Sequence, residues 1–251
     1  MIRKLFITLT ALVTVWACAT AQQPKFDFPA DTRIGIVNYL EGYATHHHFS
    51  SLRFDSFSKQ IDVDWDIPAY IENRLSNAIK ADSRYTVVLI KPANSLKGVN
   101  QEPELSGQTL KSKAIRLEKA AYLNTLAEKY DLDGLILVRS FRGPSVIKID
   151  KHPIELAGYG LLTQQLLMSK HAYAYANITV EVFKTRPLVY IGSGKPENRK
   201  ASLSNISLEG KLKNIPQSEI EKLEPLMKGY AEQAVKNAFE QTSICYRVIA
   251  G

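Results

Sequence analysis

The chain of 251 residues carries three consecutive histidines a short distance before a set of alternating aspartates. In an extended segment His46 and His48 point the same way and His47 points the opposite way. Two imidazoles two residues apart can share a zinc ion, but a zinc site needs three or four ligands. The residues that could supply a third ligand are Asp62, Asp64, His152 and His171, and no spacing selects among them.

Two hypotheses follow for this segment. In the first, His46, His48 and Asp62 hold the metal ion of a metal-dependent hydrolase. In the second, Thr45 to Phe49 is a polar surface loop without a chemical role. The aspartates do not form a calcium loop, because an EF-hand needs Gly and Glu where this chain has Ile67 and Asn73. A helix cap at Asp66 explains them more simply, since a carboxylate accepts the free N–H groups of a first helical turn.

Three other short segments or residues suggest catalytic or phosphate-binding motifs, but the residues around each exclude that interpretation. Asp131 to Leu135 resembles a phosphatase nucleophile motif, but it follows an amphipathic helix and precedes the apolar strand, which is the reverse of the required order. Gly192 to Lys195 lacks the earlier glycine and the final Ser or Thr of a phosphate-binding loop. Cys245 lies near the C-terminus at the end of a predicted helix or strand, and we interpret it as a packed residue, not a thiol nucleophile. The sequence therefore predicts no enzyme, no catalytic residues and no cofactor.

The N-terminus has the organisation of a secretory signal peptide. Arg3 and Lys4 precede an uncharged run from Leu5 to Ala17, and small residues follow. A signal peptide of residues 1–21 would be cleaved after Ala21, whereas cleavage before Cys18 would leave that cysteine to be acylated, as in a bacterial lipoprotein. Both processing sites stay open. We expect an exported, periplasmic protein, anchored to the outer membrane by lipid if Cys18 is acylated.

The formal net charge is +7, which makes the chain modestly basic. For an exported protein, an envelope protein, an anionic lipid or a wall polymer is a better match to this charge than nucleic acid. A generic solvated surface explains the same excess of lysine and arginine. The oligomeric state is not indicated by the sequence.

The elements that would position these residues follow from hydrophobic periodicity. We expect strands at 32–40, 57–63, 84–91, 135–138, 154–166, 170–183 and 188–192. We expect helices after Asp66, at 111–130, and from Pro225 onward. Residues 22–31 would be a tether, and 32–251 a single α/β (α+β) domain with a polar insert near 195–214. Its mixed sheet would have antiparallel C-terminal strands and helices mainly on one face.

The predicted strand 170–183 alternates strictly between small or aliphatic residues and polar or aromatic ones. His171, Tyr173 and Tyr175 would share its wet face, near Tyr159 across a hairpin. Such a row suits binding of a peptide, a sugar or a partner protein. Ordinary cross-strand pairing, or cover by the polar insert, would explain it equally well.

Three segments resemble a group of bacterial envelope lipoproteins: Arg33 to Val37, Leu126 to Val138, and Val180 to Leu188. The group includes the curli-secretion channel lipoprotein, the outer-membrane activators of penicillin-binding proteins and the N-terminal domain of the Tol-system propeller protein. The third segment departs from the family, because Arg186 and Pro187 stand where the family has a glycine turn. The resemblance would cover residues 32–240.

This resemblance implies a non-enzymatic protein that docks on another envelope component, and it transfers no catalytic residues. We therefore predict an accessory or binding partner of an envelope assembly, with a metal-dependent hydrolase as the alternative.

Overall fold

The computed structural model describes residues 28–50, 55–92, 110–149, 152–166, 169–198, 200–203 and 215–242. The predictions about the signal peptide, Cys18 and most of the tether lie outside these residues. None of the helices among the described residues has the length and apolar character needed to cross a membrane.

The chain forms one mixed α/β domain, which confirms the predicted fold class. The strands are β1 (Thr32–Asn38), β2 (Ala44–Ser50), β3 (Phe57–Ile61), β4 (Tyr85–Ile90), β5 (Gly134–Ser140), β6 (Gly143–Ile149), β7 (His152–Leu156), β8 (Gly158–Leu166), β9 (Ser169–Thr185), β10 (Leu188–Gly194) and β11 (Lys200–Ser202). The helices are α1 (Ile67–Lys80), α2 (Leu110–Tyr130), α3 (Gln217–Glu221) and α4 (Glu224–Thr242).

The strand order of the main sheet is β3-β2-β8-β9-β5-β1-β4, and β10 and β11 also pair with β9. β9 is 17 residues long and joins two halves of the sheet. Its residues Ser169–Asn177 pair with β8, and Ile178–Lys184 pair with β5. We call β2, β3, β8, β11 and residues 169–177 of β9 the aromatic half-sheet.

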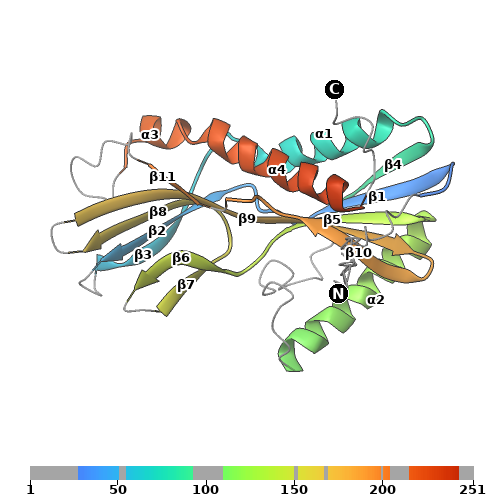
Figure 1. The fold of residues 1–251 in the computed structure, drawn as a ribbon, viewed down its shortest axis with the longest axis horizontal. Helices are drawn as coiled ribbons and strands as arrows, with labels where there is room; N and C mark the ends of the chain where they lie inside the picture. Colours follow the sequence, from blue (N-terminus) through green and yellow to red (C-terminus); the bar gives the residue numbers. More distant parts are fainter. Residues whose placement is uncertain are drawn as a thin grey trace, which may run out of the picture.

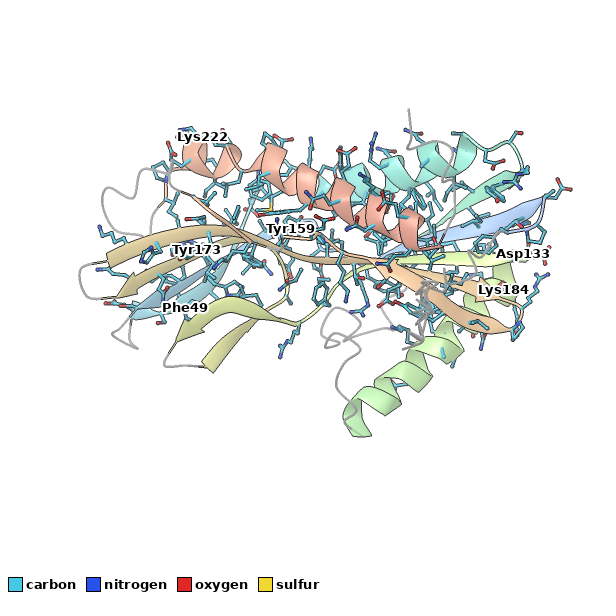
Figure 2. The ribbon with its side chains drawn as sticks, viewed as in Figure 1. Phe49, Asp133, Tyr159, Tyr173, Lys184 and Lys222 are labelled. Atoms are coloured by element: carbon cyan, nitrogen blue, oxygen red, sulfur yellow. The ribbon has the colours of Figure 1, made fainter. Side chains whose placement is uncertain are left out.

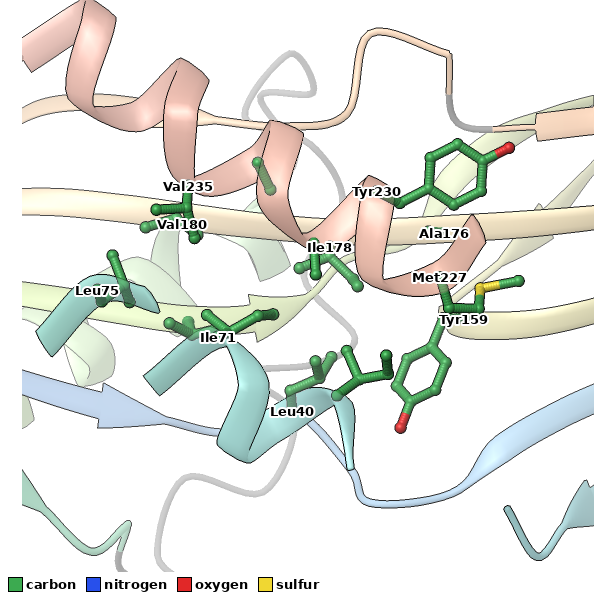
Figure 3. Close-up of a cluster of buried hydrophobic side chains, with 14 of the residues drawn as sticks. Leu40, Ile71, Leu75, Tyr159, Ala176, Ile178, Val180, Met227, Tyr230 and Val235 are labelled. Carbon is green, nitrogen blue, oxygen red and sulfur yellow. The ribbon is translucent and has the colours of Figure 1, made fainter. Parts of the chain in front are cut away.

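The main core lies between this sheet and α1, α3 and α4, which cover one of its faces (Figure 1). Ile71 and Leu75 of α1 and Met227 of α4 meet Ile178 and Val180 of β9 there (Figure 3). The alternation predicted for β9 is confirmed, since its residues at even positions from 172 to 182 are all buried in this core. Their spacing of two places one whole row of β9 on the helix-covered face.

The close approach of α4 to the sheet depends on a glycine. A Cβ atom at Gly194 of β10 would lie 2.0 Å from the carbonyl oxygen of Ala234 and 2.1 Å from the amide nitrogen of Ala238. Both atoms belong to the α4 backbone, so no side-chain movement could relieve the clash. Because glycine has no Cβ atom, the backbone of α4 can approach β10 closely at this position.

Helix α2 packs on the opposite face of the sheet (Figure 1). Leu123 and Leu126 of α2 meet Leu135, Leu137 and Phe183 of the sheet. This smaller core lies against the half of the sheet that is far from the aromatic half-sheet. It gives α2 an apolar anchor on β5 and β9.

The structure corrects several sequence-based expectations. Residues Ala44–Ser50 are a strand between β3 and β8, so the prediction of a polar surface loop there is wrong. The predicted strand 154–166 is two strands, because the chain turns at Gly158, whose φ is 73°. β7 pairs with β6 in a separate two-stranded sheet. Asp66 does lie at the N-cap of α1, but with φ 45° and without a capping side-chain hydrogen bond.

Candidate functional site

His46 and His48 lie together on the helix-covered face of β2, as their spacing predicts. Their side chains are almost fully buried, at 1% and 2% exposure. His46 Nε2 and His48 Nδ1 both lie 2.8 Å from the hydroxyl oxygen of Thr163 on β8. A hydroxyl has one hydrogen to donate, so one histidine accepts it and the other donates an N–H to the same oxygen. The two nitrogens that converge are therefore satisfied by Thr163.

This pair behaves as a buried polar contact rather than as an open ligand set. Burial, together with the charge of Lys59 and the neighbouring histidines, lowers the pKa of His46 to about 3. Asp62 is exposed beyond the end of β3, and His171 is exposed on β9. Within the described residues no group of three or more His, Cys, Asp or Glu side chains is placed to hold a metal ion. The geometry gives the metal hypothesis no third ligand in that part of the chain.

The aromatic row on β9 is graded in exposure. His171 is exposed, Tyr173 is half-buried, and Tyr175 is only 2% exposed. The rings of His171 and Tyr173 stack, with centroids 6.2 Å apart and planes 26° apart. Lys200 of β11 places its ammonium 4.1 Å from the centroid of the Tyr173 ring, a cation–π contact.

Tyr159 does not join this row, so that prediction is wrong. It pairs with Ala176 and belongs to the main core on the opposite face of the sheet. Its ring lies 6.3 Å from Trp65, and its hydroxyl donates to the carbonyl oxygen of Glu41 at 2.9 Å. Figure 2 shows Tyr159 between the sheet and the helices, and Phe49 on the other side. Strand β8 begins at Gly158, and its pairing with β9 sets Tyr159 opposite Ala176. Tyr159 therefore lies on the same helix-covered face as that alanine.

Two residues that sequence reasoning missed complete the row. His47 packs its ring 5.7 Å from that of Tyr175 and stacks on Phe49 at 6.5 Å. Burial lowers the pKa of His47 to about 4, so the ring is neutral near pH 7. Residues along β2 alternate between the two faces of the sheet, so His47 and Phe49 lie opposite to His46 and His48. A prediction of a strand at this segment would have placed both residues on the aromatic side. We call His47, Phe49, His171, Tyr173 and Tyr175 the aromatic face.

The Lys, Arg, Asp and Glu residues on the strands of the aromatic half-sheet are all of positive charge. Its strand segments contain Lys59, Lys170 and Lys200, and no aspartate or glutamate. Lys59 and Lys170 are exposed, and desolvation lowers the pKa of Lys200. Lys200 pairs with Tyr175 and so lies on the aromatic face, whereas Lys59, which pairs with His46, and Lys170, at an even position of β9, lie on the opposite face of the same end of the sheet.

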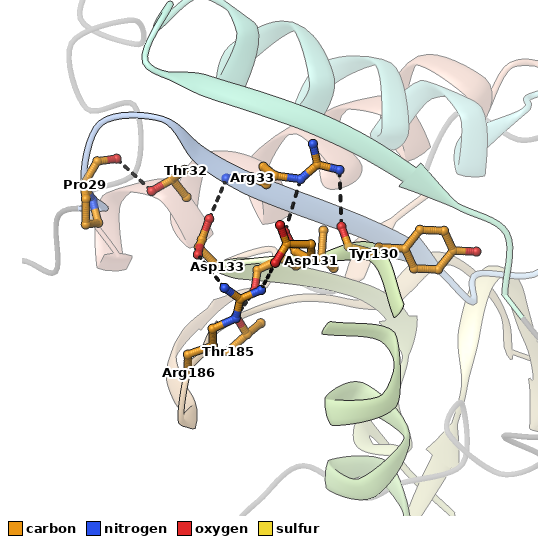
Figure 4. Close-up of polar contacts among 9 residues, drawn as sticks. Pro29, Thr32, Arg33, Tyr130, Asp131, Asp133, Thr185 and Arg186 are labelled. Atoms are coloured by element: carbon orange, nitrogen blue, oxygen red, sulfur yellow. Dashed lines mark hydrogen bonds and ion pairs between the residues drawn. The ribbon is translucent and has the colours of Figure 1, made fainter. Parts of the chain in front are cut away.

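The three segments that resemble envelope lipoproteins meet at the other end of the sheet (Figure 4). The Arg33 amide donates to Asp133 Oδ2 at 3.0 Å, and its Nε donates to the Asp131 carbonyl at 3.1 Å. Arg186 forms an ion pair with the Asp131 carboxylate, and Thr185 donates to the Leu132 carbonyl. These contacts tie β1, the α2–β5 turn and the β9–β10 turn together.

The class that this fold defines is a single mixed α/β domain with helices on both faces. No family model matches the chain, and no curated protein matches it. Solved structures similar to it include the following two. One is the C-terminal domain of LpoB from Salmonella enterica, at 7% identity and a TM-score of 0.24, covering 70% of this chain and 84% of that one. The other is lipoprotein GNA1162 from Neisseria meningitidis, at 15% identity and a TM-score of 0.27, covering 78% and 98%.

These likenesses agree with the weak resemblance to envelope lipoproteins found in the sequence. At such identities and TM-scores they support no statement about what this chain binds or does.

Proposed function

We propose that the protein is a non-enzymatic, exported cell-envelope protein that acts as an accessory or binding partner of an envelope assembly. The observation that carries the proposal is the aromatic face, where the exposed His171 and half-buried Tyr173 lie beside the ammonium of Lys200. The signal-peptide pattern of residues 1–21 supports export. The acyl anchor is a separate part of the proposal and rests on Cys18.

The aromatic face has the composition of a protein contact surface. Tyrosine and other aromatic side chains are enriched at protein interfaces, where they contribute large area for little loss of conformational entropy. Tyr175 is buried with Leu156 and Leu162, and its ring contacts that of His47, so its position at the base of the face is fixed by packing. Tyr173 and His171 are the rings a partner would reach first. The sheet orders them in advance, so binding costs little reorganisation.

The charge of the aromatic half-sheet selects the chemistry of the partner. Lys200 pairs with Tyr175 and lies over the Tyr173 ring, so its positive charge on the aromatic face favours an acidic surface. Complementary charge mainly speeds association and excludes wrong partners, whereas the buried rings supply affinity. The partner we propose is an envelope protein with an acidic contact surface.

The anchor we propose is acylation of Cys18 after cleavage before that residue. Cleavage before Cys18 would leave nine residues, 19–27, between the acylated cysteine and Phe28, which is buried in the main core, and nine residues could span at most about 32 Å when fully extended. That reach would let the domain stand away from the membrane surface to which the acyl chains hold it. The domain would then act as a tethered adaptor on the periplasmic side.

In-cell photocrosslinking tests the binding proposal. A photoreactive amino acid is placed at position 171, in the full chain, and a matched one at Thr86, an exposed position on β4 at the other edge of the sheet. We expect one dominant protein adduct from position 171 that is absent from position 86. The same adducts from both positions, no adduct, or an adduct with wall polymer alone would contradict the proposed protein partner.

A further inference from the structure

A cavity of about 310 Å³ lies beside the aromatic face, where three connections between strands converge. Leu40, Glu41 and Tyr43 line it from the β1–β2 connection. Ser140 and Arg142 line it from the end of β5, and Ala157 and Gly158 from the β7–β8 turn. Thr45 and His47 line it from β2, Ser58 from β3 and Tyr159 from β8. The volume is at the lower end of small-ligand sites and equals roughly ten water molecules at ~30 Å³ each.

Three polar groups in this wall have no ion-pair or hydrogen-bond partner for their side chains among the described residues. Within the described residues, neither the Glu41 carboxylate nor the Arg142 guanidinium makes an ion pair, although both line the same cavity. His47 Nε2 is buried and has no hydrogen-bond partner in that part of the chain. Leaving a buried nitrogen unsatisfied is unfavourable, so such an atom in a cavity wall calls for a ligand or water. The wall therefore offers an anion, a cation and a neutral imidazole to one occupant.

We propose that this cavity binds a small zwitterion of the amino-acid class, with its ammonium at Glu41, its carboxylate at Arg142 and a hydrogen bond to His47. A ligand with a single charge would meet one like charge in the wall, whereas a ligand with both charges satisfies both side chains. Charge-assisted hydrogen bonds of this kind are about twice as strong as neutral ones. Leu40 and Tyr43 leave an apolar surface for the ligand's side chain.

The same chemistry could come from a free amino acid or from a dipeptide. A longer peptide would hold its two charged ends too far apart for a cavity of this volume. The site is separate from the aromatic face except at His47, and the proposed function does not depend on it.

Isothermal titration calorimetry on the full-length protein tests the proposal. The ligands are L-phenylalanine and L-alanyl-L-phenylalanine, each compared with its N-acetylated and its C-amidated analogue. We expect at least one of the two zwitterions to bind, and each capping group to weaken it about tenfold or more, since every 1.4 kcal/mol is tenfold. The zwitterion that binds more tightly identifies the source.

Charge-neutral variants assign the ends of the ligand. In Glu41→Gln the N-acetylated and free ligands should bind equally, and in Arg142→Gln the amidated and free ligands should bind equally. Glu128→Gln and Arg84→Gln, exposed positions on α2 and before β4, serve as matched controls and should keep the full difference. Failure of both zwitterions to bind, equal binding of the capped analogues, or unchanged selectivity in both cavity variants would overturn the proposal.

Discussion

Glu181 is the most deeply buried carboxylate among the residues that the structure describes, at 2% exposure on β9. Arg139 donates to its Oε1 through Nε at 3.0 Å and through Nη2 at 2.5 Å, and Lys119 of α2 donates to Oε2 at 3.1 Å. Burial alone would raise the pKa of Glu181, but Arg139 and Lys119 together lower it below its ordinary value. This cluster is the polar link between α2 and the sheet.

Removing the carboxylate should take the charge of Glu181 away from two buried cations. We expect Glu181→Gln to lower the free energy of unfolding by about 3–5 kcal/mol. Glu232→Gln removes an exposed ion pair with Arg74 and should cost about 0–1 kcal/mol. Urea denaturation followed by circular dichroism measures both. Equal effects of the two substitutions would contradict the assigned burial of the cluster.

His46 makes stability depend on pH in a defined direction. Its folded pKa of about 3 lies below the ordinary histidine value of 6.5, so the unfolded chain takes up a proton at a higher pH than the folded one. Stability is therefore greatest above about pH 6.5 and falls as the pH drops toward 3, by about 1.4 kcal/mol per pH unit for this residue.

Between pH 6 and 4, His46→Gln should reduce the change of the unfolding free energy with pH by about 1.4 kcal/mol per pH unit, which is the contribution of one proton. Gln60→Ala, an exposed position without a titratable side chain on the neighbouring strand β3, is the control and should leave the slope unchanged. Urea unfolding midpoints at several pH values measure the slopes. If wild type and His46→Gln lose stability in parallel, His46 is not the buried neutral group described above.

At the scale of elements, β9 and α4 determine how closely the layers pack. The alternation of β9 was predictable, because six apolar residues at even positions give a clear period of two. The β2 strand was not, because its buried row is made of histidines, whose burial depends on Thr163, more than a hundred residues away. β11 and α3 are short and polar, and their structure comes from tertiary contacts rather than from a local pattern.

Two glycine substitutions should act in opposite directions. Gly194→Ala places a Cβ atom 2.0 Å from the α4 backbone and should destabilise the fold by about 3 kcal/mol, the upper end for an overpacked core. Gly229→Ala lies inside α4, where a Cβ atom meets nothing within 4 Å, and should stabilise by about 0.5–1 kcal/mol. Thermal melts compare them. A stable Gly194→Ala variant would contradict the close α4–β10 contact.

At the scale of the whole molecule, two ends of one sheet carry different features. Arg33, Asp131, Asp133 and Arg186 tie three chain segments together at one end. The aromatic face and the lysines lie at the other. The sequence predicted three of the five residues of that face, since His171, Tyr173 and Tyr175 were placed on one side of β9. It missed His47 and Phe49 and misplaced Tyr159, because the registers of β2 and β8 depend on pairing between distant strands.

The proposed anchor can be tested independently of binding. Cells grown with labelled palmitate should yield a labelled wild-type protein in the membrane fraction, and Cys18→Ala should abolish the label and release the protein. Cys245→Ala is the matched control and should keep both. Label that persists in Cys18→Ala, or an unlabelled wild type, would contradict acylation at Cys18 while leaving the proposed contact surface standing.

The affinity of the protein captured at position 171 tests the central claim most directly. Measured by biolayer interferometry, Tyr173→Ala should weaken its binding by about 2 kcal/mol, which is roughly 30-fold, as expected for an aromatic residue that anchors an interface. Lys200→Glu should slow association, and Tyr130→Ala, at the end of α2, should change nothing. Unaltered binding by Tyr173→Ala and Lys200→Glu together would contradict the aromatic face as the contact surface.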